Sequence, residues 1–231
     1  MKNIISDKDF CSEISTSALD PEHSKQFKSF LRGKQYKKAA LYIATCLFDK
    51  PFSHPIAEKD IPQMAELIKA EVPEQITYLE KLAKNYWLKA AQPIPAKTSA
   101  YDFAFYHIPN TTQRARGNAV YTLCRLAHLT GKDGYIKHAM KMMREVAAVH
   151  GDYANGSPVG FYVWHPHTAG KKYSQNVAHI AQEFCMMLPF IRTLINDNDK
   201  LYILKLLWTI ADLAQRAFKK DQSFNLTLHF V

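Results

Sequence analysis

The chain has 231 residues, of which 47% are hydrophobic, a proportion typical of one large globular domain. Only eight residues are glycine, which disfavours a β-rich fold with many tight turns. The formal net charge of +9 favours encounters with polyanions but does not choose among nucleic acid, anionic lipid and acidic polysaccharide. No run approaches ~20 apolar residues and the first residues lack an apolar core, so we expect neither a membrane span nor a signal peptide.

Helix-terminating residues and helical periodicity predict helices in the first part of the chain. Asp20 is suited to cap a helix that begins at Pro21, and Gly33 is suited to end it. Apolar residues at helical spacing predict a second helix over 35–48. Proline-led helices are expected at about 62–70 and 73–84, whereas the aromatic-rich segment 92–112, with three prolines, is expected to be irregular.

A helical hairpin is the clearest element of the second part. Its arms are predicted at 113–129 and 135–149, with Gly131 in a left-handed conformation at the turn. A loop follows, and a second hairpin is predicted from helices at 172–195 and 199–218; only 161–164 has a strand-like pattern. The sequence therefore predicts a single all-α domain over 1–231, built from consecutive antiparallel helix hairpins that form a solenoid or an (α/α) toroid.

The four cysteines do not match a metal site, because no C-x-x-C pair or zinc spacing is present. Three of them lie in apolar helical patterns, which predicts buried thiols. The pair His165 and His167 has a spacing at which two imidazoles can share a metal in an extended loop, but the sequence nearby supplies no carboxylate. We therefore expect a polar loop there, with no metal and no cofactor.

The segment 164–172 combines residues suited to an anionic sugar. The indole of Trp164 can stack on a pyranose ring, and Lys171 and Lys172, with His165, can face its carboxylate or sulfate groups. A solvated helix start is the alternative. Arg114 and Arg116 open the predicted helix at 113–129, where cations oppose the helix dipole, so they are either solvated or face a ligand.

These segments resemble the N-terminal helical domain of the heparinase II/III-type polysaccharide lyases. The resemblance rests on short motifs at 5–10, 33–40 and 127–135, and on Trp164-His165-Pro166 followed by Lys172. It covers nearly the whole chain and implies an incomplete toroid, a uronate glycan as substrate and a periplasmic or secreted location.

The resemblance also implies a mechanism. Members of the family neutralise the substrate carboxylate with an Asn and move protons with Tyr and His during β-elimination. Asn225 lies where that Asn is expected, although its neighbours match only loosely. The family's Tyr and His and its C-terminal β-sandwich are expected beyond Val231, so we expect little lyase turnover from this chain alone.

A helical-repeat interaction module without enzymatic activity is the alternative. Segments 35–40 and 133–139 are similar to tetratricopeptide repeats, but their separation is not a multiple of the ~34-residue repeat. We expect an acidic polysaccharide as the partner, and nucleic acid to bind only through non-specific charge. The apolar run at 226–231 further predicts homo-oligomers.

Overall fold

The computed structural model describes residues 4–15, 19–50, 58–90, 103–150, 163–164, 172–173 and 184–221. These residues are helical apart from turns and one pair of two-residue strands, which confirms the predicted all-α character. The elements are α1 (Asp7–Glu13), α2 (Pro21–Arg32), α3 (Tyr36–Phe48), the 3-10 turn Glu58–Asp60, α4 (Ile61–Glu71), α5 (Glu74–Ala90), α6 (Phe103–Thr130), α7 (Asp133–His150), β1 (Val163–Trp164), β2 (Lys172–Tyr173), a helix at 184–191 and α9 (Asp197–Asp221).

The predicted helix ends follow from local chemistry. The Asp20 side chain accepts a hydrogen bond from the His23 backbone N–H at 2.9 Å and so caps α2, with Pro21 in the first turn. Gly131 has φ +67° between α6 and α7, and its N–H donates to the Ala127 carbonyl at 2.8 Å. The predicted hairpin around a left-handed glycine is therefore confirmed.

Two predicted boundaries are wrong. The segment expected to be irregular up to residue 112 is helical from Phe103, so α6 begins ten residues early and contains Pro109. A proline removes one backbone donor but has a helix-compatible φ, so the remaining hydrogen bonds of a long helix can span it. The helix predicted to begin at Lys172 is also incorrect there, because Lys172 and Tyr173 form β2, paired with the strand-like Val163 and Trp164. Helical periodicity compares residues three and four positions apart, so it does not detect pairing with a strand eight to ten residues earlier.

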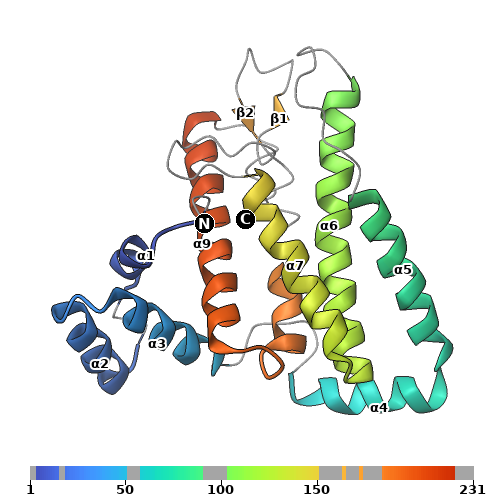
Figure 1. Ribbon diagram of the computed structural model, residues 1–231, viewed down its shortest axis with the longest axis horizontal. Helices are drawn as coiled ribbons and strands as arrows, with labels where there is room; N and C mark the ends of the chain where they lie inside the picture. The colour runs from blue at the N-terminus through green and yellow to red at the C-terminus, as the bar shows by residue number, and fades with distance from the viewer. Residues whose placement is uncertain are drawn as a thin grey trace.

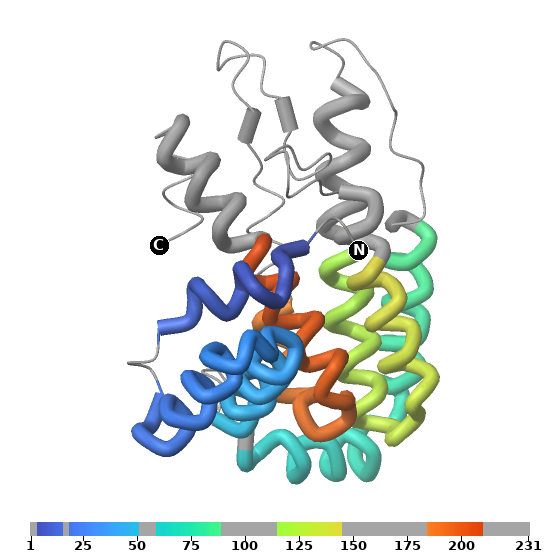
Figure 2. The backbone as a smooth tube through the Cα atoms, turned by 60° about the vertical axis from the view of Figure 1, so that its left-hand side comes forward, coloured from blue at the N-terminus to red at the C-terminus, as the bar shows by residue number. Residues whose placement is uncertain are grey.

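The helices are arranged in two parts joined by α9 (Figures 1 and 2). α5, α6 and α7 lie side by side and run in alternating directions, and α4 crosses the end where α6 turns into α7. α1, α2 and α3 pack together on the other side of α9. α9 therefore packs against both parts. None of the helices within the described ranges is long and apolar enough to cross a membrane.

Buried apolar residues form two clusters that meet at α9. The larger cluster lies among α4–α7, the helix at 184–191 and α9, and its largest fully buried side chains include Leu126, Met142 and Phe184. The smaller cluster is centred on Phe27 and lies among α1, α2, α3 and α9. Leu204 packs against both clusters. Cys46 and Cys124 are buried, as predicted, whereas Cys185 in the predicted helix at 172–195 is exposed; Cys11, which lies outside the predicted helices, is also buried.

The N-terminal segment is attached to α9 by polar contacts. The backbone N–H of Ile5 donates to Thr209 Oγ1 at 3.2 Å, and Lys205 Nζ donates to Asp7 Oδ1 at 2.6 Å. The Lys205 side chain is only 11% exposed. An ammonium group that is this poorly solvated requires a carboxylate partner, so the ion pair fixes where α1 meets α9.

Candidate polyanion-binding surface

Two of the predicted glycan-binding residues are neighbours in a pair of strands. Trp164 in β1 is paired directly with Lys172 in the antiparallel strand β2. Directly opposed positions are the closest cross-strand neighbours in a sheet. β1 contacts α6 and β2 contacts α9, so this short ladder lies beside the two long helices. His165, Lys171 and Asn225 lie outside the described residues.

The two predicted arginines lie inside α6 rather than at its start. Because α6 begins at Phe103, Arg114 and Arg116 are more than two turns from its N-terminus, where the dipole would oppose them. The Arg116 side chain is buried, with 7% of its surface exposed. Of the two alternatives left open by the sequence, a solvated Arg116 does not describe this structure.

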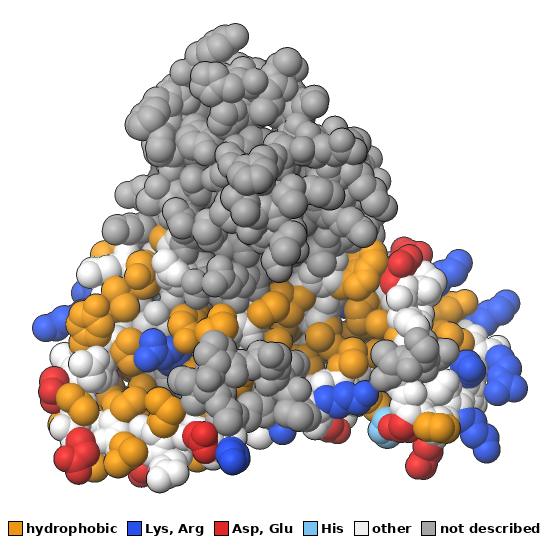
Figure 3. All heavy atoms as spheres, turned by 180° about the vertical axis from the view of Figure 1, so that it is seen from behind, with side chains coloured by type: hydrophobic (Ala, Val, Ile, Leu, Met, Phe, Trp, Pro, Cys, Tyr) orange, Lys and Arg blue, Asp and Glu red, His pale blue; other side chains and the backbone are white. Residues whose placement is uncertain are grey.

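A denser group of cations lies on the hairpin formed by α2 and α3. Residues 25–38 contain five lysines and one arginine and no Asp or Glu. All six cations are exposed, and no carboxylate among the described residues forms an ion pair with any of them. Figure 3 shows blue side chains lining this end of the molecule. We call this group the α2–α3 basic surface: Lys25, Lys28, Arg32, Lys34, Lys37 and Lys38.

Helical geometry aligns the cations of α2. Lys25, Lys28 and Arg32 are spaced three and four residues apart, which places them on one side of the helix. Phe27 lies on the opposite side and is fully buried in the smaller core cluster. The packing of the apolar side therefore turns the cationic side toward solvent.

The start of α3 adds to the positive potential. Lys37 and Lys38 lie in its first turn, which contains no acidic residue, and Gln35 at the N-cap position makes no side-chain capping hydrogen bond. The N-terminus of a helix carries a partial positive charge, so lysines there are destabilising by a few tenths of a kcal/mol each. Helix stability alone therefore does not favour lysine at these positions.

Lys34 occupies the turn between the two helices in an unusual backbone conformation. Its φ is +53°, whereas Gly33 has φ −78°. The Lys34 N–H donates to the Leu31 carbonyl at 3.0 Å, and the Gln35 N–H donates to the Phe30 carbonyl at 2.9 Å. This is the Schellman arrangement, in which the left-handed position is normally glycine because a Cβ is unfavourable there.

Side-chain contacts hold α2 and α3 together beneath these cations. His23 Nδ1 lies 2.7 Å from the Tyr42 hydroxyl, and His23 Nε2 lies 3.3 Å from Asp20 Oδ2. The Tyr42 ring also packs edge-to-face with Phe30, with centroids 5.7 Å apart. An imidazole between a carboxylate and a phenol has its orientation fixed, so these contacts make the hairpin a defined platform.

This group was not identified as a site from the sequence. The available signal was the absence of Asp and Glu from 25–38, combined with the predicted helix break at Gly33. Only the folded hairpin shows that the lysines of two helices share one surface. Within the described part of the chain, no group of three His, Cys, Asp or Glu residues is placed to hold a metal ion.

Comparison with known protein families, with curated proteins and with solved structures finds no match to this chain.

Proposed function

We propose that this protein binds an acidic polysaccharide through the α2–α3 basic surface. The observation that carries the proposal is the set of six exposed cations without carboxylate partners among the described residues. Binding a polyanion releases the counterions condensed on it, and the gain grows with the number of cations that contact the chain. Such a surface suits a linear, regularly charged ligand.

The composition of the surface favours a polysaccharide over nucleic acid. Five of its six cations are lysines, compact point charges that pair with sulfate, carboxylate and phosphate alike, so the choice depends on what accompanies the cations. Binding of single-stranded nucleic acid also uses exposed aromatic side chains for stacking. None of the large apolar side chains found exposed in the described residues lies on α2 or α3. The same lack of an apolar anchor disfavours a lipid surface.

The resemblance to heparinase II/III-type lyases supplies a biological setting for this proposal. The resemblance implies that the helix hairpins form part of an (α/α) toroid. It also implies β-elimination across a uronate, with Asn225 neutralising the substrate carboxylate. Trp164 and Lys172, which are paired in the strands, form a second contact for the same glycan under this proposal. Formation of unsaturated uronate, followed by ultraviolet absorbance, tests the catalytic part separately from binding.

Binding is tested with heparin, alginate and a nucleic acid of matched charge, titrated over a range of salt concentrations. The triple variant K25Q/K28Q/R32Q should bind the glycan about 5- to 30-fold more weakly, because each exposed ion pair contributes about 0–1 kcal/mol. It should also lower the slope of log affinity against log salt by about half, since three of six cations are removed.

The matched control removes three exposed lysines from the other part of the molecule, in K81Q/K84Q/K141Q. An equal loss of affinity in the control would mean that binding depends on the total charge of the protein and not on the α2–α3 basic surface. Trp164→Ala removes no charge, so a weaker glycan complex with unchanged nucleic-acid binding supports the second contact. Equal affinity for glycan and nucleic acid in all variants contradicts the proposal for a polysaccharide.

Exposed apolar side chains favour the interaction module as a second candidate function. Leu67 on α4 and Tyr78 and Leu88 on α5 are 53%, 57% and 60% exposed. Helical repeats commonly bind partners with one face of their stacked helices. Loss of partner binding in L67S/L88S, with glycan affinity retained, would support this function over the first.

A further inference from the structure

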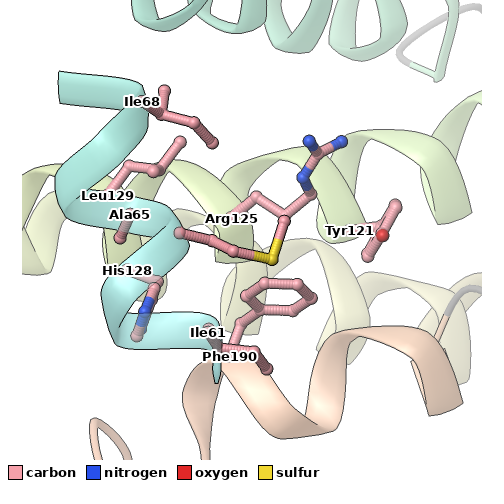
Figure 4. A pocket seen from close by; sticks show the side chains of 9 residues that line it. Ile61, Ala65, Ile68, Tyr121, Arg125, His128, Leu129 and Phe190 are labelled. Carbon is pink, nitrogen blue, oxygen red and sulfur yellow. The ribbon is translucent and has the colours of Figure 1, made fainter. Parts of the chain in front are cut away.

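A pocket of about 140 Å³ lies between α4, α6 and the helix at 184–191, on the opposite side of α9 from the basic surface (Figure 4). Its volume is close to that of engineered apolar cavities that bind benzene. Most of its lining is apolar, and three side chains carry polar groups. The lining residues are Ile61, Met64, Ala65, Ile68, Tyr121, Arg125, His128, Leu129 and Phe190.

Aromatic rings shape the pocket. Phe190 packs edge-to-face with Tyr121, with ring centroids 6.1 Å apart, and with His128 at 5.9 Å. Phe190 itself is only 8% exposed, so its ring is held in place by the surrounding core. A flat apolar ring that enters the pocket therefore meets preformed aromatic walls, which favour edge-to-face and offset contacts.

Arg125 supplies a cation at one side of the pocket. Its guanidinium carbon lies 5.5 Å from the centroid of the Tyr121 ring, and the side chain is only partly exposed. Among the described residues, no carboxylate forms an ion pair with Arg125. A partly buried guanidinium with an aromatic neighbour and no carboxylate is a preformed anchor for a ligand carboxylate.

His128 supplies an unused hydrogen-bonding atom. Its Nε2 is buried and has no hydrogen-bond partner among the described residues. Burial lowers the pKa of His128, a hydrogen bond to the Ile61 backbone opposes this shift, and the charge of Lys69 adds to it. A neutral imidazole that uses one nitrogen for a backbone carbonyl offers the other as an acceptor. A hydroxyl group on a ligand matches that acceptor.

The two polar groups lie apart. Figure 4 shows the Arg125 guanidinium on the side of Tyr121 and the His128 ring beside α4, with the Phe190 ring on the helix below them. We propose that the pocket binds a small aromatic carboxylate with a hydroxyl group at the far end of its ring. The carboxylate pairs with Arg125, the ring packs against Phe190 and Leu129, and the hydroxyl donates to His128 Nε2.

The proposal is independent of glycan binding, and calorimetry with simple probes tests it. The probes are 4-hydroxybenzoate, benzoate and the neutral benzyl alcohol. We expect 4-hydroxybenzoate to bind more tightly than benzoate, and benzyl alcohol to bind at least tenfold more weakly than benzoate. In spectra of methyl-labelled protein, the Met64 signal should shift on titration, because Met64 lines the pocket.

Two variants separate the polar contacts. Arg125→Gln should weaken binding of both carboxylates at least tenfold, whereas His128→Leu, which removes the acceptor, should remove the preference for 4-hydroxybenzoate over benzoate. Lys81→Gln, which removes one exposed positive charge from α5, is the control and should change neither affinity. Circular dichroism melts show whether each variant is folded.

Several outcomes overturn the proposal. One is binding of benzyl alcohol as tight as that of benzoate, and another is a folded Arg125→Gln protein that binds both carboxylates like the wild type. A folded His128→Leu protein that keeps the preference for the hydroxyl removes His128 from the site. Absence of any shift of the Met64 signal at millimolar probe also refutes the pocket as a binding site.

Discussion

Replacing Lys34 with glycine should make the protein more stable and weaken its binding to a polyanion. Lys34 has φ +53°, a conformation that costs an L-residue about 1–2 kcal/mol and costs glycine almost nothing. Glycine loses about 0.4–1 kcal/mol of this gain because it makes the unfolded chain more flexible. The expected net gain is about 0.5–1 kcal/mol, or a rise in Tm of roughly 1–4 °C for a domain of this size.

Lys34→Ala is the matched variant for this prediction. Alanine removes the same charge but keeps the Cβ atom that makes the left-handed conformation unfavourable. Both variants should therefore weaken heparin binding to a similar extent, while only Lys34→Gly should be more stable than the wild type in urea denaturation. Equal stability of Lys34→Gly and Lys34→Ala would refute the reasoning. It would mean that the backbone at this turn stores no strain.

Three further predictions concern stability and assembly. Gly131→Ala should lower the free energy of unfolding by about 1 kcal/mol, measured by urea denaturation, because the new Cβ meets no described atom within 4 Å apart from its chain neighbours, so the cost lies in the left-handed backbone. The hydrogen bond to Glu80 and burial raise the pKa of Tyr135 to about 12, and burial raises the pKa of Tyr202 to about 12. The hydroxyls of both tyrosines therefore keep their protons in the folded state at pH values where the unfolded chain, with a tyrosine pKa near 10, releases them. Their contribution to the free energy of unfolding is complete below pH 10 and is lost as the pH rises toward 12. Tyr135→Phe should make this alkaline decline shallower in denaturation curves recorded at several pH values, and an unchanged decline would contradict it. The apolar run at 226–231 predicts self-association, and a monomer by light scattering at high concentration would count against it.

Local features of the fold were predictable because their causes are local. The cap at Asp20 and the left-handed Gly131 each depend on residues within one turn of a helix, and both are found where the sequence indicates. The start of α6 was not predictable from Pro109, because a proline in a long helix removes only one of many hydrogen bonds. The strand β2 forms because Lys172 pairs with Trp164, eight residues earlier in the chain, and helical periodicity does not detect such pairing.

The candidate sites depended on contacts between distant segments. The six cations of the α2–α3 basic surface are close in sequence, yet the exposure of the three on α2 follows from the burial of Phe27, and that of Lys37 and Lys38 from the burial of the apolar side of α3. The pocket is harder to predict from the sequence. It forms where Arg125 and His128 of α6 contact residues of two other helices, such as Ile61 and Phe190. Nothing in the sequence around Arg125 indicates that no carboxylate within the described ranges pairs with it.

The attachment of the N-terminal segment to α9 has a consequence for synthesis of the chain. Ile5 and Thr209 are separated by 204 positions, so the contact between them forms only after more than 200 further residues have been synthesised. At about 5–20 residues per second, α1 waits roughly 10–40 s for its place beside α9. During that interval Phe10 and Cys11, which are buried in the finished protein, have no α9 to cover them. The α1–α9 contact is therefore a late step of folding, before which these apolar side chains of α1 stay exposed.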